Sequence, residues 1–80
     1  MPKMDSTHRS VVQINHIFDR EFDNIVRMGW ACDRIAWLAK FRKIPAELRD
    51  ALCAKAIAVM DGSWYGDEPE ERTIRAYLNA

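Results

Sequence analysis

Pro45 constrains this chain more than any other residue, because it divides the most helix-prone stretch into two segments. Residues 30–60 read WACDRIAWLAKFRKIPAELRDALCAKAIAVM and hold most of the strong helix formers. A proline disfavours the α conformation of the residue before it, here Ile44, and fits the first turn of a following helix. The sequence therefore predicts one helix over about 31–43, a second from Pro45 to about Met60, and a corner at Ile44-Pro45 between them.

Ahead of this stretch, apolar residues recur at steps of three and four, which predicts a helix over about 7–28. The apolar stripe of this helix consists of Val11, Ile14, Phe18, Phe22 and Ile25. Gly29 follows, and it is expected to end the helix because glycine adopts the left-handed conformation without steric cost. Residues 1–5 are expected to fray.

A last helix is predicted over about 68–78. Asp67 and Glu70 have the spacing of a capping box, and Pro69 falls in the first turn. No segment alternates with a period of two over enough residues to make a strand. The sequence thus predicts an all-α fold, a bundle of about four helices in a single domain over residues 1–80. Besides the first stripe, the expected core residues are Trp30, Ala31, Ile35, Leu38, Leu48, Leu52, Ala56, Val59, Ile74, Tyr77 and Leu78.

Net charge and hydropathy limit the classes of protein to which this chain can belong. Twelve basic and twelve acidic residues cancel, which argues against bulk attraction to nucleic acid. The first ten residues are polar, and the longest apolar run, 56–60, is far shorter than a membrane span. A cytoplasmic protein without a membrane partner is expected. Two cysteines are too few for a disulfide scaffold, so Cys32 and Cys53 are expected to be buried thiols, with a bridge between them as the alternative if their two helices pack antiparallel.

The sequence contains no pattern typical of a metal centre or an active site. His8, His16, Cys32 and Cys53 have the right atom types for zinc but not the spacing of a zinc site. No nucleophile elbow or glycine-rich phosphate loop is present. We expect no catalytic activity, no cofactor and no metal.

Two pairs of aromatic residues favour binding to another protein. Trp37 and Phe41 lie on a lateral apolar strip of the helix predicted over 31–43, and Trp64 and Tyr65 lie between two glycines in loop 62–66. Tryptophan and tyrosine are enriched where proteins dock. The sequence predicts a stoichiometric adaptor, regulator or inhibitor of a larger protein, a small accessory protein of the phage or plasmid type. Homodimerisation through the alanine-rich flank of 51–60 is a further expectation.

A basic patch favours a second interpretation, a small helix-turn-helix-like DNA-binding regulator. The patch consists of Arg34, Lys40, Arg42 and Lys43, interleaved with the two aromatic residues of the same helix. The corner at Ile44-Pro45 would join the two helices of the motif. It lacks the glycine that this turn often contains, and Glu47 and Asp50 would face phosphate groups unfavourably.

Overall fold

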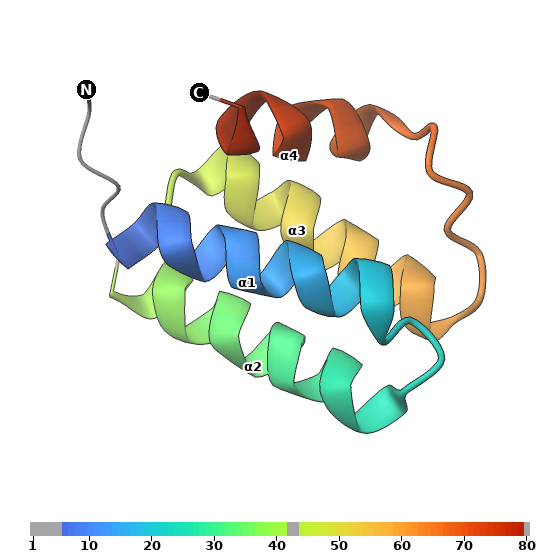
Figure 1. Cartoon of the computed structure of the whole chain (residues 1–80). Coiled ribbons are helices and arrows are strands. Elements are labelled where there is room, and N and C mark those ends of the chain that lie inside the picture. Colours follow the sequence, from blue (N-terminus) through green and yellow to red (C-terminus); the bar gives the residue numbers. More distant parts are fainter. Residues whose placement is uncertain (1–5, 42–43, 80) are drawn as a thin grey trace.

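The computed structural model describes residues 6–41 and 44–79, which form four α-helices and contain no strand (Figure 1). The helices are α1 (Ser6–Arg20), α2 (Ile25–Lys40), α3 (Ala46–Met60) and α4 (Pro69–Leu78). The predicted all-α fold with four helices is confirmed. The predicted corner is also present, with Pro45 as the N-cap of α3 at φ −60°. Residues 1–5, expected to fray, lie outside the described residues.

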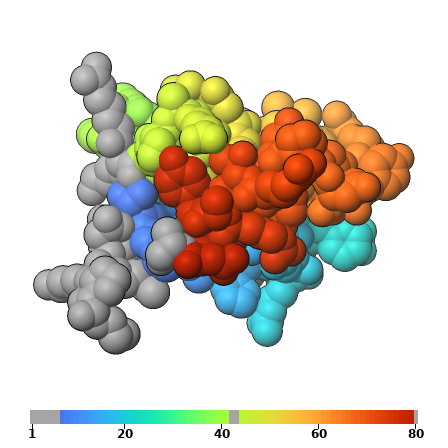
Figure 2. Space-filling view, turned by 90° about the horizontal axis from the view of Figure 1, so that it is seen from above, coloured from blue at the N-terminus to red at the C-terminus, as the bar shows by residue number. Residues whose placement is uncertain are grey.

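The helix α3 lies at the centre of the arrangement. It packs against both α2 and α4, and α1 contacts α2 and α4 (Figure 1). Seen from above, α4 lies across the bundle, and the loop between α3 and α4 lies beside the turn between α1 and α2 at one end of the molecule (Figure 2). This end, where the two connections meet, carries the candidate site.

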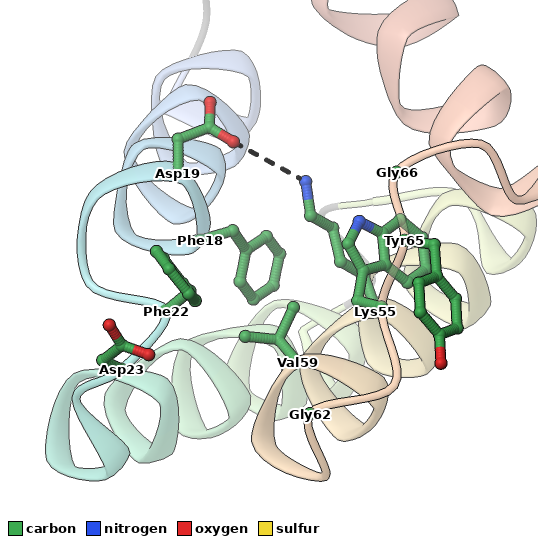
Figure 3. Close-up of a pocket in the computed structure, with 10 residues that line it drawn as sticks. Phe18, Asp19, Phe22, Asp23, Lys55, Val59, Gly62, Tyr65 and Gly66 are labelled. Carbon is green, nitrogen blue, oxygen red and sulfur yellow. Dashed lines mark ion pairs between the residues drawn. The ribbon is translucent and has the colours of Figure 1, made fainter.

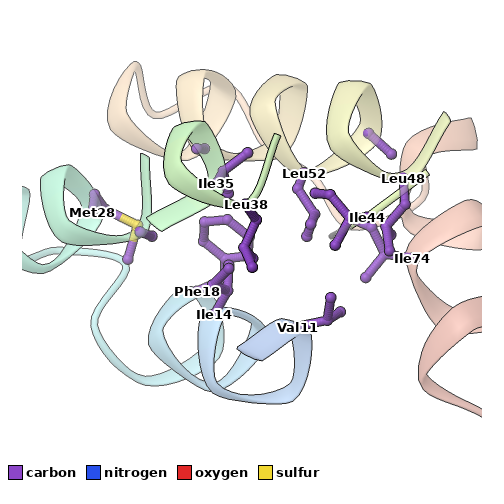
Figure 4. Close-up of a cluster of buried hydrophobic side chains, with 13 residues drawn as sticks. Val11, Ile14, Phe18, Met28, Ile35, Leu38, Ile44, Leu48, Leu52 and Ile74 are labelled. Atoms are coloured by element: carbon purple, nitrogen blue, oxygen red, sulfur yellow. The ribbon is translucent and has the colours of Figure 1, made fainter. Parts of the chain in front are cut away.

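Side chains from all four helices converge on one apolar core (Figure 4). The predicted inner faces of α2 and α4 point into it, through Ile35, Leu38 and Ile74, each at most 1% exposed. Fully burying a side chain of this size contributes about 1.5–3 kcal/mol. The buried apolar residues are Val11, Ile14, Phe18, Met28, Ala31, Ile35, Leu38, Ile44, Leu48, Ala51, Leu52, Ala56 and Ile74.

The prediction of one long first helix over 7–28 is wrong. α1 ends at Arg20, residues 21–24 make a turn, and α2 begins at Ile25. Asn24 is the N-cap of α2, and its side-chain oxygen accepts a hydrogen bond from the N–H of Arg27 at 3.2 Å. The turn is about as long as one helical turn, so the three- and four-residue spacing continues through it although the helix does not. Phe22 is consequently 58% exposed, outside the core.

The early start of α2 changes the roles of two more residues. Gly29 lies inside α2 and does not end a helix. Trp30, expected in the core, is 54% exposed because Met28 and Ala31 occupy the core face of α2 on either side of it. At its other end α2 stops at Lys40 with Phe41 as its C-cap, before the predicted end.

The predicted capping box of the last helix does not form. The N-cap of α4 is Glu68, and the side chain of Glu68 caps no helical N–H group. Its carboxylate instead accepts hydrogen bonds from the N–H groups of Tyr65 and Gly66, each at 2.9 Å. The Glu68 carboxylate therefore stabilises the loop before α4 through these two hydrogen bonds and does not cap the helix.

Candidate functional site

A pocket of about 410 Å³ opens at the end of the bundle where the two connections meet (Figure 3). One wall is the end of α1 and the turn after it, and the other is loop 61–68 with the end of α3. Side chains from both walls surround the opening. The lining residues that matter for its chemistry are Phe18, Asp19, Phe22, Asp23, Lys55, Trp64 and Tyr65.

Lys55 forms the floor of the pocket, with its side chain 4% exposed. Its ammonium group donates a hydrogen bond to Glu71 Oε2 at 3.0 Å and one to Asn15 Oδ1 at 3.3 Å. Asp19 Oδ1 lies farther away, at 3.9 Å. A buried charge is tolerated where it is paired and hydrogen-bonded, and the contacts with Glu71 and Asn15 meet this requirement.

Two aromatic rings complete the surroundings of this ammonium group. Lys55 Nζ lies 5.1 Å from the centroid of the Phe18 ring and 5.5 Å from that of Trp64. Both distances are within the range of a cation–π contact. Lys55 on α3 therefore joins α1, α4 and the loop that carries Trp64, and it fixes the position of the loop.

Sequence reasoning missed Lys55 and its partner Glu71, although a signal for both was present. Lys55 lies at helical spacing from Leu52, a core residue of α3, and Glu71 has the same relation to Ile74 of α4. One basic and one acidic residue, each alone on an apolar face, indicate a buried ion pair. Glu71 also accepts a contact from Arg75 Nε at 3.1 Å, so its second oxygen is paired as well.

The mouth of the pocket combines exposed aromatic rings with carboxylates. Phe22 is 58% exposed and Tyr65 is 82% exposed. Asp19 and Asp23 lie on the same wall as Phe22, and Tyr65 lies on the opposite wall (Figure 3). Two carboxylates and one ammonium group line the pocket, so the net charge of its lining is negative.

Glu68 shapes the loop that carries Tyr65. The hydrogen bond from the N–H of Tyr65, with smaller contributions from neighbouring N–H groups, holds the pKa of Glu68 below its usual value. Gly62 and Gly66 adopt φ of +72° and +90°, a region that other residues rarely occupy. These turns and the Glu68 hydrogen bonds set the backbone of the loop beside the pocket.

The structure separates the four aromatic residues predicted to bind a partner. Trp64 and Tyr65 lie at the pocket, where Trp64 is half-buried over Lys55. Trp37 and Phe41 lie at the C-terminal end of α2, with their ring centroids 5.0 Å apart. The prediction therefore covers two surfaces and not one.

The predicted basic patch is described only in part. Arg34 stacks over the ring of Trp37 at 4.6 Å, and its Nη2 donates to Ser10 Oγ at 3.0 Å. Lys40 is exposed, whereas Arg42 and Lys43 lie outside the described residues. The exposed start of α3 is acidic at Glu47 and Asp50.

Cys32 and Cys53 are free and partly buried thiols on α2 and α3. Burial raises the pKa of Cys32 above its usual value, and the carboxylate of Asp33 adds to the shift. Burial also raises the pKa of Cys53. A thiol attacks as the thiolate, so a raised pKa lowers the thiolate fraction of each group at neutral pH.

Other kinds of site find no support in the part of the chain that the structure describes. Within residues 6–41 and 44–79, no three or more His, Cys, Asp or Glu side chains are grouped so that they could hold a metal ion. None of the helices described is both long enough and apolar enough to span a membrane. Comparisons with protein-family models, with curated proteins and with solved structures find no match to this chain.

Proposed function

We propose that the protein acts without catalysis, by stoichiometric binding of another protein, and that the pocket receives a basic side chain of this partner. One observation carries the proposal. Two strongly exposed aromatic residues, Phe22 and Tyr65, line a pocket together with two carboxylates and a single ammonium group, so the charge of the lining is negative. An adaptor, a regulator or an inhibitor of a larger protein would bind in this way.

The chemistry of the mouth suits an arginine or lysine side chain. Aromatic faces attract a cation and also cover the apolar stem of such a side chain. Carboxylates accept charge-assisted hydrogen bonds, which are stronger than those between neutral groups. The side chain of Asp19 is 61% exposed, its Oδ1 forms an ion pair with Lys55 at 3.9 Å and its Oδ2 accepts a hydrogen bond from Asn15 at 3.3 Å. An ionised carboxylate has about four lone-pair sites, so acceptor capacity remains for a ligand.

Isothermal calorimetry with two matched peptides tests the proposal. One eight-residue peptide carries two arginines among leucines, and the other carries glutamate in place of arginine. We expect the arginine peptide to bind and the glutamate peptide not to bind. Asp23→Asn and Tyr65→Ala should each weaken binding about two- to fivefold, the effect of one exposed contact.

Glu47→Gln provides the matched control, because it removes an exposed carboxylate on α3, away from the pocket. This variant should bind the arginine peptide as the parent protein does. Equal binding of both peptides, or equal loss in Glu47→Gln and Asp23→Asn, would contradict the proposal.

A further inference from the structure

The helix α2 presents an apolar stripe to solvent along its whole length. The stripe consists of Val26, Trp30, Trp37 and Phe41, which are 62%, 54%, 40% and 54% exposed. At the pitch of an α-helix these four positions fall within an arc of about 60°. The core residues of α2, such as Ile35, lie on a different face. Large exposed rings in a row mark a docking surface more often than chance exposure.

The order of residues in this stripe is symmetric about the midpoint between Asp33 and Arg34. Val26 and Phe41 are equally far from that midpoint along the sequence, and so are Trp30 and Trp37. A twofold axis through the midpoint would pack two α2 helices antiparallel. It would bring Trp30 level with Trp37 of the second copy and Val26 level with Phe41 of the second copy. A twofold interface requires this self-complementarity.

The same register pairs opposite charges at the centre. Asp33 and Arg34 are both exposed, and each would lie level with the other residue of the second copy. A guanidinium group has five N–H donors, so the contact of Arg34 with Ser10 leaves donors for a carboxylate. We infer that the exposed stripe of α2 is a self-association surface whose partner is a second, antiparallel copy of this chain. This inference does not depend on the pocket or on the proposed function.

The surface next to the stripe offers space for the rings. A groove of about 410 Å³ lies between α1 and α2, bordered by Ile17, Trp30 and Arg34. In the antiparallel register, Trp37 of the second copy lies level with Trp30, which borders this groove. Trp30 itself is held on its other side by Arg27, whose Cζ lies 4.7 Å from the ring centroid.

The surface area that the stripe can bury limits the strength of the association. At ~200 Å² for a fully exposed ring, the three aromatic residues offer roughly 300 Å² on each copy. With the flanking residues the total interface reaches about 1,000 Å², the lower limit for a specific interface. Arg27 would lie level with Lys40 of the second copy, and these like charges weaken the pairing. A transient dimer is therefore expected.

The expected homodimer through the alanine-rich part of α3 has less support. Ala51, Lys55 and Ala56 of that segment are buried within the single chain. These three residues are not available to a second copy, although Ile57 and Met60 of the same segment are 60% and 43% exposed.

Charge exchange at the centre tests the inference, with sedimentation velocity over a concentration series up to about 1 mM, the range of a weak dimer. Asp33→Arg would place one arginine opposite Arg34 of the other copy, twice in each dimer, and should weaken dimerisation at least about tenfold. The double variant Asp33→Arg/Arg34→Asp restores opposite charges and should return dimerisation to within about threefold of the parent protein. Glu47→Arg makes the same charge change on α3 and should have no effect.

Trp30→Ala is a second test that leaves the contact between Arg34 and Ser10 intact. The residue is half exposed, so the variant should keep its helical circular dichroism while losing the dimer. A parent protein that remains monomeric at every concentration would overturn the inference. So would a dimer that is indifferent to Asp33→Arg, or a double variant that dimerises no better than Asp33→Arg alone.

Discussion

Removing one partner of the buried Lys55–Glu71 pair should destabilise the fold far more than removing both. Breaking a buried ion pair from one side costs about 3–5 kcal/mol, because a charge is left without its partner. Glu71→Leu should cost about 3 kcal/mol, the lower end of that range, because Asn15 Oδ1 at 3.3 Å still accepts from the ammonium group. For a domain of this size that cost lowers Tm by about 12–24 °C.

The reverse substitution should be milder. In Lys55→Met, Glu71 keeps its ion pair with Arg75 at 3.1 Å. Because the side chain of this arginine is 67% exposed, it compensates the buried carboxylate only in part, and we expect the variant to lose about 2 kcal/mol of stability. The double variant Lys55→Met/Glu71→Leu should cost about 0–1 kcal/mol, because apolar side chains of similar volume replace a fully desolvated pair. The coupling between the two substitutions, which is the sum of the two single costs less the cost of the double variant, is then about 4–5 kcal/mol.

Urea denaturation followed by far-UV circular dichroism measures these free energies of unfolding. The exposed pair of Arg49 and Asp50, 2.9 Å apart with side chains 42% and 71% exposed, is the control. Asp50→Asn should change stability by less than about 0.5 kcal/mol. Strictly additive costs for Lys55→Met and Glu71→Leu would refute the reasoning, because additivity means that the two charges do not stabilise each other.

The Glu68 carboxyl group should titrate below the usual range of glutamate in a carbon NMR titration, because loop N–H groups bond its ionised form. Its contribution to stability is therefore present above the ordinary glutamate pKa and is lost as the pH falls through the lower folded-state pKa, and Glu68→Gln should abolish this loss. Labelled random duplex DNA should not bind at low salt, because the chain has no net charge and the exposed start of α3 is acidic at Glu47 and Asp50. Tight anisotropy-detected binding that falls steeply with salt would instead favour the helix-turn-helix alternative.

Most of the helical core was predictable from spacing, whereas the boundary between α1 and α2 was not. Leu38 and Leu52 lie on strongly periodic segments, and the structure buries both. The turn after Arg20 was missed because its length preserves the helical spacing of Phe18 and Phe22. Asn24, the cap that begins α2, competes with helix continuation through one side-chain hydrogen bond, and this competition leaves no trace in an apolar pattern.

Of the two walls of the pocket, only the loop was predictable from the sequence. Two glycines around Trp64 and Tyr65 indicated an aromatic loop, but the opposite wall depends on where α1 ends. Asp19 and Asp23 look like ordinary solvent-facing acids in the sequence, and Phe22 looks like a core residue. These side chains come to one opening only because the loop packs against the end of α1, and Lys55 contacts residues of both.

The proposed binding site is tested most directly by titrating the isotopically labelled protein with the arginine peptide and following backbone amides by two-dimensional NMR. The account predicts saturable shifts at Phe22, Gly62 and Gly66, which line the pocket, and none at Trp37 and Phe41. The glutamate peptide should move none of these signals. Shifts confined to α2, or shifts of the pocket amides that both peptides cause equally, would contradict a pocket that selects basic side chains.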